Sequence, residues 1–225
     1  MNKTLSSILK ATLATLLFVV GNELIGSWVL LVDLFEFENY YILFPVMQGA
    51  LQLSAVLVFF FLIGNRTLKS LIKETQYRWY PFAALLGILF VFLQMPLNWF
   101  YNLITGSDYF SSYRFEGFSN IDIRKHSASI VFLPIAEELF FRRYIQHNLQ
   151  KSANQEAALF VASLLFALIH SPYALLFTEY SNSDWHSVYI TFFGGLATGI
   201  LYIKSKSVGP PILFHIFWNL TAYSL

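Results

Sequence analysis

The run PFAALLGILFVFLQMPLNWFYNLI, residues 81–104, holds 24 residues and no charged side chain. The hydrocarbon core of a bilayer is about 30 Å thick, and a helix crosses it with about 20 apolar residues. Strands of a membrane barrel would alternate apolar and polar residues, and this run does not alternate. Because a helix satisfies its own backbone amides inside lipid, we predict that the run is a transmembrane helix.

The composition of the whole chain extends this prediction. Of its 225 residues, 56% are hydrophobic and 12% are charged, whereas a soluble domain carries about 25% charged residues. The net charge of +1 provides no basic surface, so nucleic acid is excluded as a partner. The absence of cysteine excludes disulfides, thiolate metal sites and a Cys nucleophile. We predict an all-α polytopic membrane protein embedded in the lipid bilayer.

Six further apolar stretches accompany residues 81–104, so we predict a transmembrane helix bundle of about seven spans. No internal repeat or linker is visible, so residues 1–225 are predicted to form a single transmembrane domain. The first stretch is too long for a signal peptide and is interpreted as a retained span. The predicted spans are 8–32, 41–63, 81–104, 128–149, 157–177, 187–203 and 210–225.

The basic residues between the spans predict the orientation, because cytoplasmic segments carry an excess of Lys and Arg. With the N-terminus inside, eleven basic residues fall on the inner side and three on the outer side. We therefore predict an N-terminus inside and a C-terminus outside. The outer segment 105–127 is interpreted as a loop, with an interfacial helix as the alternative. The inner residues are Lys3, Lys10, Arg66, Lys69, Lys73, Arg78, Arg142, Arg143, Lys151, Lys204 and Lys206, and the outer ones are Arg114, Arg124 and Lys125.

Several polar side chains interrupt the predicted spans. An ionisable group at the centre of a membrane helix costs about 2.5–3.5 kcal/mol on insertion scales, so each is a hypothesis for a functional site. Glu137 and Glu138 lie in the fourth span, His170 lies in the fifth, and His215 and Asn219 lie in the seventh. Glu23 in the first span receives no role.

The two adjacent acids of the fourth span have different predicted partners. Glu138 precedes Arg142 by four residues, which is the favourable order for a helical ion pair. Glu137 points about 100° away on the same helix and gains no such partner, so it remains available for chemistry. Pro134 lacks an amide hydrogen and is predicted to kink the helix one turn earlier.

The remaining polar residues are predicted to meet these acids. His215 and Asn219 lie one helical turn apart, so they share a face. Together with Glu137 and His170 they make a set that activates water and holds an oxyanion. Each residue alone also has a structural interpretation: Glu138 with Arg142 as an ion pair, a histidine as a packing residue, and Asn219 as a cross-link between helices.

Three motifs in order give the pattern a family resemblance. They are Glu-Glu-x-x-x-Arg from Glu137 to Arg142, Phe-x-x-x-His from Phe166 to His170, and His-x-x-x-Asn from His215 to Asn219. The pattern resembles the CPBP (Abi) family, which comprises type II CAAX prenyl endopeptidases and bacterial relatives linked to bacteriocin processing and self-immunity. The resemblance covers 128–225, which would be the catalytic core.

The resemblance implies an intramembrane endopeptidase and a role for each motif residue. Glu137 would activate water together with His170, His215 and Asn219 would stabilise the oxyanion, and Glu138 with Arg142 would form the supporting pair. Phe166 would shape the pocket. The substrate would be a CAAX-type, bacteriocin-like or pheromone-like peptide, or a membrane protein, that reaches the site from the inner leaflet or the cytoplasmic side. The location would be a bacterial plasma membrane.

Two alternatives to this interpretation stay open. The helix motif His-Glu-x-x-His that supplies two zinc ligands is absent, and we expect no cofactor. Glu137, His170 and His215 would nevertheless suffice for a zinc-type site with an open water position. A non-catalytic membrane immunity or peptide-binding protein is the alternative function, and a small transporter ranks last because no repeat is visible.

Overall fold

A computed structural model describes residues 3–27, 40–63, 76–109, 117, 121–171 and 182–225 of the chain. Every ordered element within these residues is a helix, which confirms the predicted all-α class. The helices are α1 (Lys3–Gly26), α3 (Tyr40–Leu62), α5 (Trp79–Thr105), α6 (Ile123–Ser127), η2 (Ala128–Phe132), α7 (Leu133–Glu138), η3 (Leu139–Gln146), α8 (His147–Leu149), α9 (Gln155–Leu168), α10 (Asn182–Ser205) and α11 (Gly209–Ala222).

Each predicted span contains a helix at its place in the chain. Among the described residues, four helices are long and apolar enough to cross a membrane, namely Lys3–Gly26, Phe44–Leu62, Trp79–Thr105 and Trp185–Ser205. The first helix begins at Lys3 instead of residue 8, and α9 ends at Leu168. Residues 28–32 and 172–177 of the predicted spans lie outside the described residues, as do residues 110–116, which include Arg114, and 118–120 of segment 105–127.

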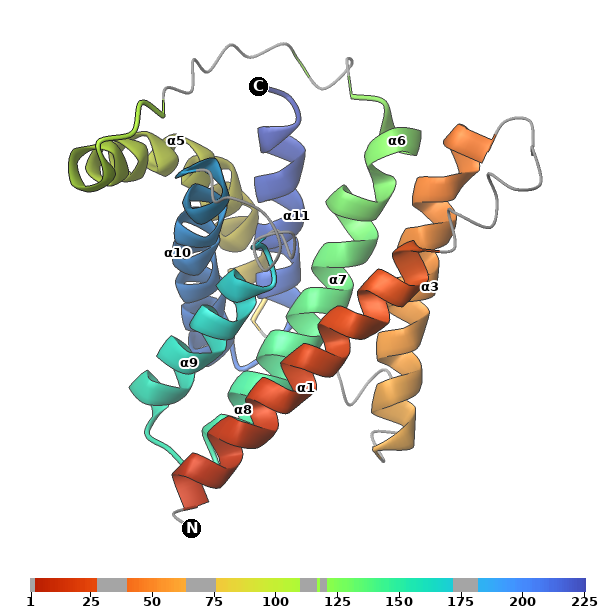
Figure 1. The fold of residues 1–225 in the computed structure, drawn as a ribbon, viewed down its shortest axis with the longest axis vertical. Helices are drawn as coiled ribbons and strands as arrows, with labels where there is room; N and C mark the ends of the chain where they lie inside the picture. The colour runs from red at the N-terminus through yellow and green to blue at the C-terminus, as the bar shows by residue number, and fades with distance from the viewer. Residues whose placement is uncertain (1–2, 28–39, 64–75, 110–116, 118–120, 172–181) are drawn as a thin grey trace.

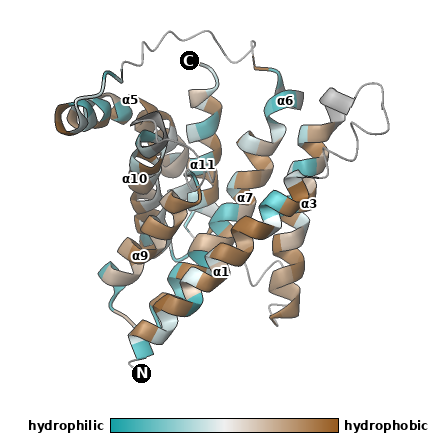
Figure 2. Cartoon of the chain, viewed as in Figure 1, coloured by the Kyte–Doolittle hydropathy of each residue, from teal (hydrophilic) through white to brown (hydrophobic). Residues whose placement is uncertain are grey.

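The helices run alternately up and down the bundle. Figure 1 shows the two termini at opposite ends of the long axis, as an odd number of crossings requires. Leu17 on α1 and Leu103 on α5 are 64% and 66% exposed. Figure 2 shows hydrophobic residues along the outward faces of α1 and α3. Such apolar outer surfaces fit lipid as the surrounding solvent.

The fourth span is one continuous helical run with two widened turns. The π-helical segments η2 and η3 flank the short α7, which carries Pro134 and both acids. The disturbance predicted at Pro134 therefore takes the form of a π-helical turn directly before it. Such turns are frequent at functional sites because they release backbone groups and rotate the side chains that follow.

Close helix contacts around the fourth span depend on small residues of α10. A Cβ at Gly195 would lie 3.1 Å from the Phe166 ring and 3.2 Å from Ser163 Cα of α9. A Cβ at Gly199 would lie 3.0 Å from Gln146 Oε1. These glycines therefore allow close packing of α10 against the helices that carry the polar residues.

We expect Gly87→Ala to destabilise the contact between α5 and α11. A Cβ at Gly87 would overlap the backbone carbonyl of Phe214, and a backbone atom cannot rotate away. Overpacking of this kind costs about 1–3 kcal/mol, measured as a lower unfolding temperature in detergent. Gly21→Ala is the matched control, because nothing lies within 4 Å of its Cβ and alanine favours a helix by about 0.5–1 kcal/mol. Equal unfolding temperatures for the two variants would contradict this prediction.

Candidate active site

The two adjacent acids of α7 occupy different environments. Glu138 is 0% exposed, whereas Glu137 is 8% exposed and lines a cavity of about 530 Å³. Glu138 Oε2 accepts a hydrogen bond from Arg142 Nε at 3.0 Å, which is the ion pair expected from their spacing. Glu138 is therefore buried and paired inside the bundle, whereas Glu137 lines the cavity.

A chain of buried polar contacts holds Arg142 in place. Its Nη1 donates to Gln146 Oε1 at 3.3 Å, and Gln146 Nε2 donates to the carbonyl of Gly199 at 3.1 Å. The guanidinium lies 5.2 Å from the centre of the Phe166 ring, within the range of a cation–π contact. Arg142, Gln146 and Phe166 are all 0% exposed. These contacts hold the charge of Arg142 at one position, about one helical turn after Glu138 along the fourth span.

His215 on α11 connects the two acids. Its Nδ1 donates to Glu138 Oε1 at 3.1 Å, and its Nε2 lies 3.9 Å from Glu137 Oε2. The ring stacks on Trp218, the residue directly before Asn219, with 5.4 Å between ring centres. Both carboxylate oxygens of Glu138 are therefore engaged, one by Arg142 and one by His215. The Nε2 atom of His215 is directed toward the acid that lines the cavity.

Asn219 is positioned by the π-helical turn η2. In that turn the amide of Leu133 bonds to the carbonyl of Ala128, five residues earlier. The equivalent donor for the Ser129 carbonyl would be residue 134, which is a proline without an N–H. Asn219 Nδ2 donates to this carbonyl at 2.7 Å. Pro134 thus cannot donate to the Ser129 carbonyl, and the bond from Asn219 to this carbonyl orients the carboxamide.

His170 lies directly after α9 and reaches the same cavity. Its Nδ1 donates to the carbonyl of Phe166 at 2.8 Å, which leaves Nε2 for another partner. Phe166 is completely buried, with His170 and His215 at 4.9 and 5.7 Å between ring centres. The ring of Phe166 thus separates the buried Arg142 from the two histidines and forms a wall beside them.

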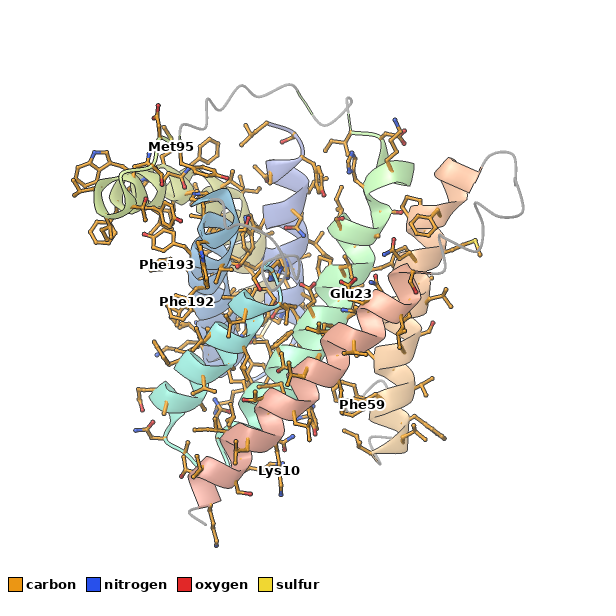
Figure 3. The ribbon with its side chains drawn as sticks, in the orientation of Figure 1. Lys10, Glu23, Phe59, Met95, Phe192 and Phe193 are labelled. Carbon is orange, nitrogen blue, oxygen red and sulfur yellow. The ribbon has the colours of Figure 1, made fainter. Side chains whose placement is uncertain are left out.

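The structure brings the four predicted site residues to one cavity. Glu137, His170, His215 and Asn219 all line the same 530 Å³ space, and they come from the fourth, fifth and seventh spans. Glu138 and Arg142 do not line it. Glu23 is exposed on α1, where Figure 3 labels it, and it is not among the lining residues.

His186 also lines the cavity, although none of the three sequence motifs includes it. In the structure its Nε2 donates to Asn98 Oδ1 at 2.7 Å, and its ring stacks on Tyr109 with 3.6 Å between centres. In the sequence, this contact could have been suspected only from Asn98 in the third span, because a buried amide inside an apolar run needs a hydrogen-bond partner. Its partner lies 88 residues away, so spacing could not identify it.

The side chains that could ligate a metal ion are the acids and histidines at the cavity. Within the described part of the chain, no three His, Cys, Asp or Glu side chains are grouped so that they could hold a metal ion. Glu138 and the Phe166 carbonyl hold the Nδ1 atoms of His215 and His170, so only Nε2 of each ring faces the shared space. The site therefore presents one carboxylate, two imidazoles and one carboxamide to the cavity.

Comparison with known proteins agrees with the motif pattern. Residues 126–221 match the family model described as "Type II CAAX prenyl endopeptidase Rce1-like". No curated protein and no solved structure matches the chain. The matched region begins just before η2 and ends in α11, so it contains all four residues that line the cavity together.

Proposed function

Because its segment 126–221 places this chain in the type II CAAX prenyl endopeptidase Rce1-like family, we propose that it is an intramembrane endopeptidase that hydrolyses a peptide bond near the membrane. The observation that carries the proposal is the convergence of Glu137, His170, His215 and Asn219 on one cavity inside the bundle. The apolar outer surfaces of the helices support an integral membrane location, which we propose to be a bacterial plasma membrane.

Glu137 is the proposed general base. Its neighbour Glu138 has both oxygens engaged, by Arg142 and by His215, whereas Glu137 borders the cavity. In the proposed reaction a water gives its proton to Glu137 while its oxygen forms a bond to the scissile carbonyl carbon. The tetrahedral intermediate then breaks the C–N bond, and Glu137 returns the proton to the leaving amine. His170 Nε2 orients the water.

His215 and Asn219 are the proposed oxyanion donors. The second hydrogen of Asn219 Nδ2 is available, because the Ser129 carbonyl accepts only the first. When the His215 ring donates from both nitrogens, the Glu138 carboxylate at Nδ1 offsets its charge, and Nε2–H serves the oxyanion. Both donors are held before substrate binds, which is the condition for effective electrostatic stabilisation.

We expect Asn219→Ala to lower kcat while the protein stays folded and membrane-inserted. Removal of one oxyanion donor costs about 10²–10³ in kcat, because the developing charge loses a fixed N–H. Turnover of a peptide substrate by purified protein in detergent measures the effect. Asn148→Ala is the matched control, because Asn148 contacts Lys151 outside the cavity. A normal kcat for Asn219→Ala would remove this residue from the proposed site.

The glutamate mechanism also predicts the response to chelators. If Glu137 alone activates the water, prolonged treatment with a strong divalent-metal chelator leaves turnover unchanged in the purified enzyme. Loss of turnover that zinc restores would instead assign Glu137, His170 and His215 as metal ligands. The measurement is the initial rate before and after dialysis, with total metal determined on the same sample.

The function itself is tested by the peptides that the protein releases. Membranes that carry the native chain are compared by mass spectrometry with membranes that carry Glu137→Gln at equal abundance. The proposal predicts cleaved peptides that occur only with the native chain. If the cellular phenotype survives substitution of Glu137, His170 and His215 one at a time, a non-catalytic immunity or peptide-binding role replaces the peptidase.

A further inference from the structure

The cavity is formed at one end of the bundle. Its lining includes Ser129 at the start of the fourth span, His186 and Ser187 near the start of α10, and Ala222 and Tyr223 at the end of α11. Figure 1 shows α6, the start of α10 and the C-terminus at the end of the bundle opposite the N-terminus. The lining residues that lie near the ends of their helices are therefore at the end of the bundle that holds the C-terminus of the chain.

Toward the N-terminal end the same space is closed by packed side chains. Glu138, Arg142 and Gln146 follow Glu137 along the fourth span, and all three are 0% exposed. Gln146 bonds to the Gly199 carbonyl, which joins this floor to α10. Leu149, at the end of the run, is 1% exposed. No lining residue of the cavity comes from the fourth span beyond Glu137.

The distribution of charge identifies the side of the membrane on which each end lies. Lys10 lies in the lower half of α1 in Figure 3, and Lys151 and Lys204 flank the inner connections at the same end. Arg142 does not belong among the basic residues of the inner connecting segments, because it is completely buried in the bundle. Ten inner basic residues against three outer ones remain, so the positive-inside rule still places the N-terminal end in the cytoplasm.

Combining the two observations, we infer that the cavity opens to the extracytoplasmic side, so that the substrate is an exported peptide or an extracytoplasmic segment of a membrane protein. The substrate class rests on the proposed peptidase function, whereas the side of opening does not. This inference differs from the expectation that the substrate reaches the site from the inner leaflet or the cytoplasmic side. The buried floor around Arg142 is the physical reason, because a peptide from that side would have to displace a fixed, desolvated charge.

The absence of cysteine from the chain makes the side of opening directly measurable. Ser187→Cys and Ala222→Cys place a thiol at two exposed positions that line the cavity. Gln155→Cys marks the cytoplasmic end at the exposed start of α9, and Asp122→Cys marks the opposite end. A membrane-impermeant maleimide is added to sealed spheroplasts and, separately, to sealed inside-out vesicles.

We expect the two cavity thiols and Asp122→Cys to react in spheroplasts and to be protected in inside-out vesicles. Gln155→Cys should show the opposite pattern. Cavity thiols that react together with Gln155→Cys, or from both sides, or not even in detergent solution, would overturn the inference. The result does not require hydrolysis, so it stands or falls separately from the loss of cleavage expected for Glu137→Gln.

Discussion

Glu137→Gln should abolish peptide hydrolysis while the protein keeps its fold. Glutamine preserves the size of the side chain at a position that is 8% exposed, but it cannot accept a proton from water. General-base catalysis contributes about 10²–10⁴ in rate, so a loss of at least this size is expected in kcat. Substrate affinity should change little, because the cavity keeps its shape. Single-turnover cleavage and peptide binding, measured on the same purified protein, separate the two quantities.

Glu156→Gln is the matched control for this substitution. Glu156 is an exposed acid on α9 outside the cavity, so the same chemical change there should leave kcat unaltered. The unfolding temperature in detergent checks that Glu137→Gln remains folded. Retained turnover in a folded Glu137→Gln protein would mean that another group activates the water, and Glu137 would lose its proposed role.

Local sequence patterns could predict those parts of the site that depend on a single helix. The four-residue spacing of Glu138 and Arg142 is a property of helical geometry, and the ion pair is present at 3.0 Å. Hydropathy likewise predicted a helix at each apolar stretch, because burial in lipid acts on every residue of a span. Pro134 was predicted to kink the helix, and the structure has a π-helical turn directly before it, which was not anticipated.

The particular hydrogen bonds between helices could not be predicted from the sequence, although the meeting of their polar residues at one place was predicted. The bond from Asn219 to the Ser129 carbonyl joins residues 90 apart, and it lies at the π-helical turn η2, where Pro134 has no N–H to donate to that carbonyl. The bond from His215 to Glu138 spans 77 residues and depends on how α11 packs against α7. Arg142 was counted as an inner basic residue, which is wrong because its pairing with Glu138 buries it completely.

Arg142→Met should cause the largest loss of stability of any single substitution considered for this chain. Methionine fills a similar volume but leaves the Glu138 carboxylate, 0% exposed, without its nearest opposite charge. Removal of one partner from a buried ion pair costs about 3–5 kcal/mol, because the remaining charge is desolvated and uncompensated. Gln146 would also lose the donor that its Oε1 accepts from. Thermal unfolding in detergent measures the loss.

Two further variants show whether the buried charge is the cause. Lys125→Met breaks an exposed pair with Asp122, whose side chains are 70% and 48% exposed and 3.9 Å apart. Exposed pairs contribute about 0–1 kcal/mol, so this variant should unfold close to the native temperature. Adding Glu138→Leu to Arg142→Met removes the uncompensated charge, and most of the lost stability should return although hydrolysis does not. An Arg142→Met protein as stable as Lys125→Met would show that packing, and not the buried ion pair, holds the fourth span in place.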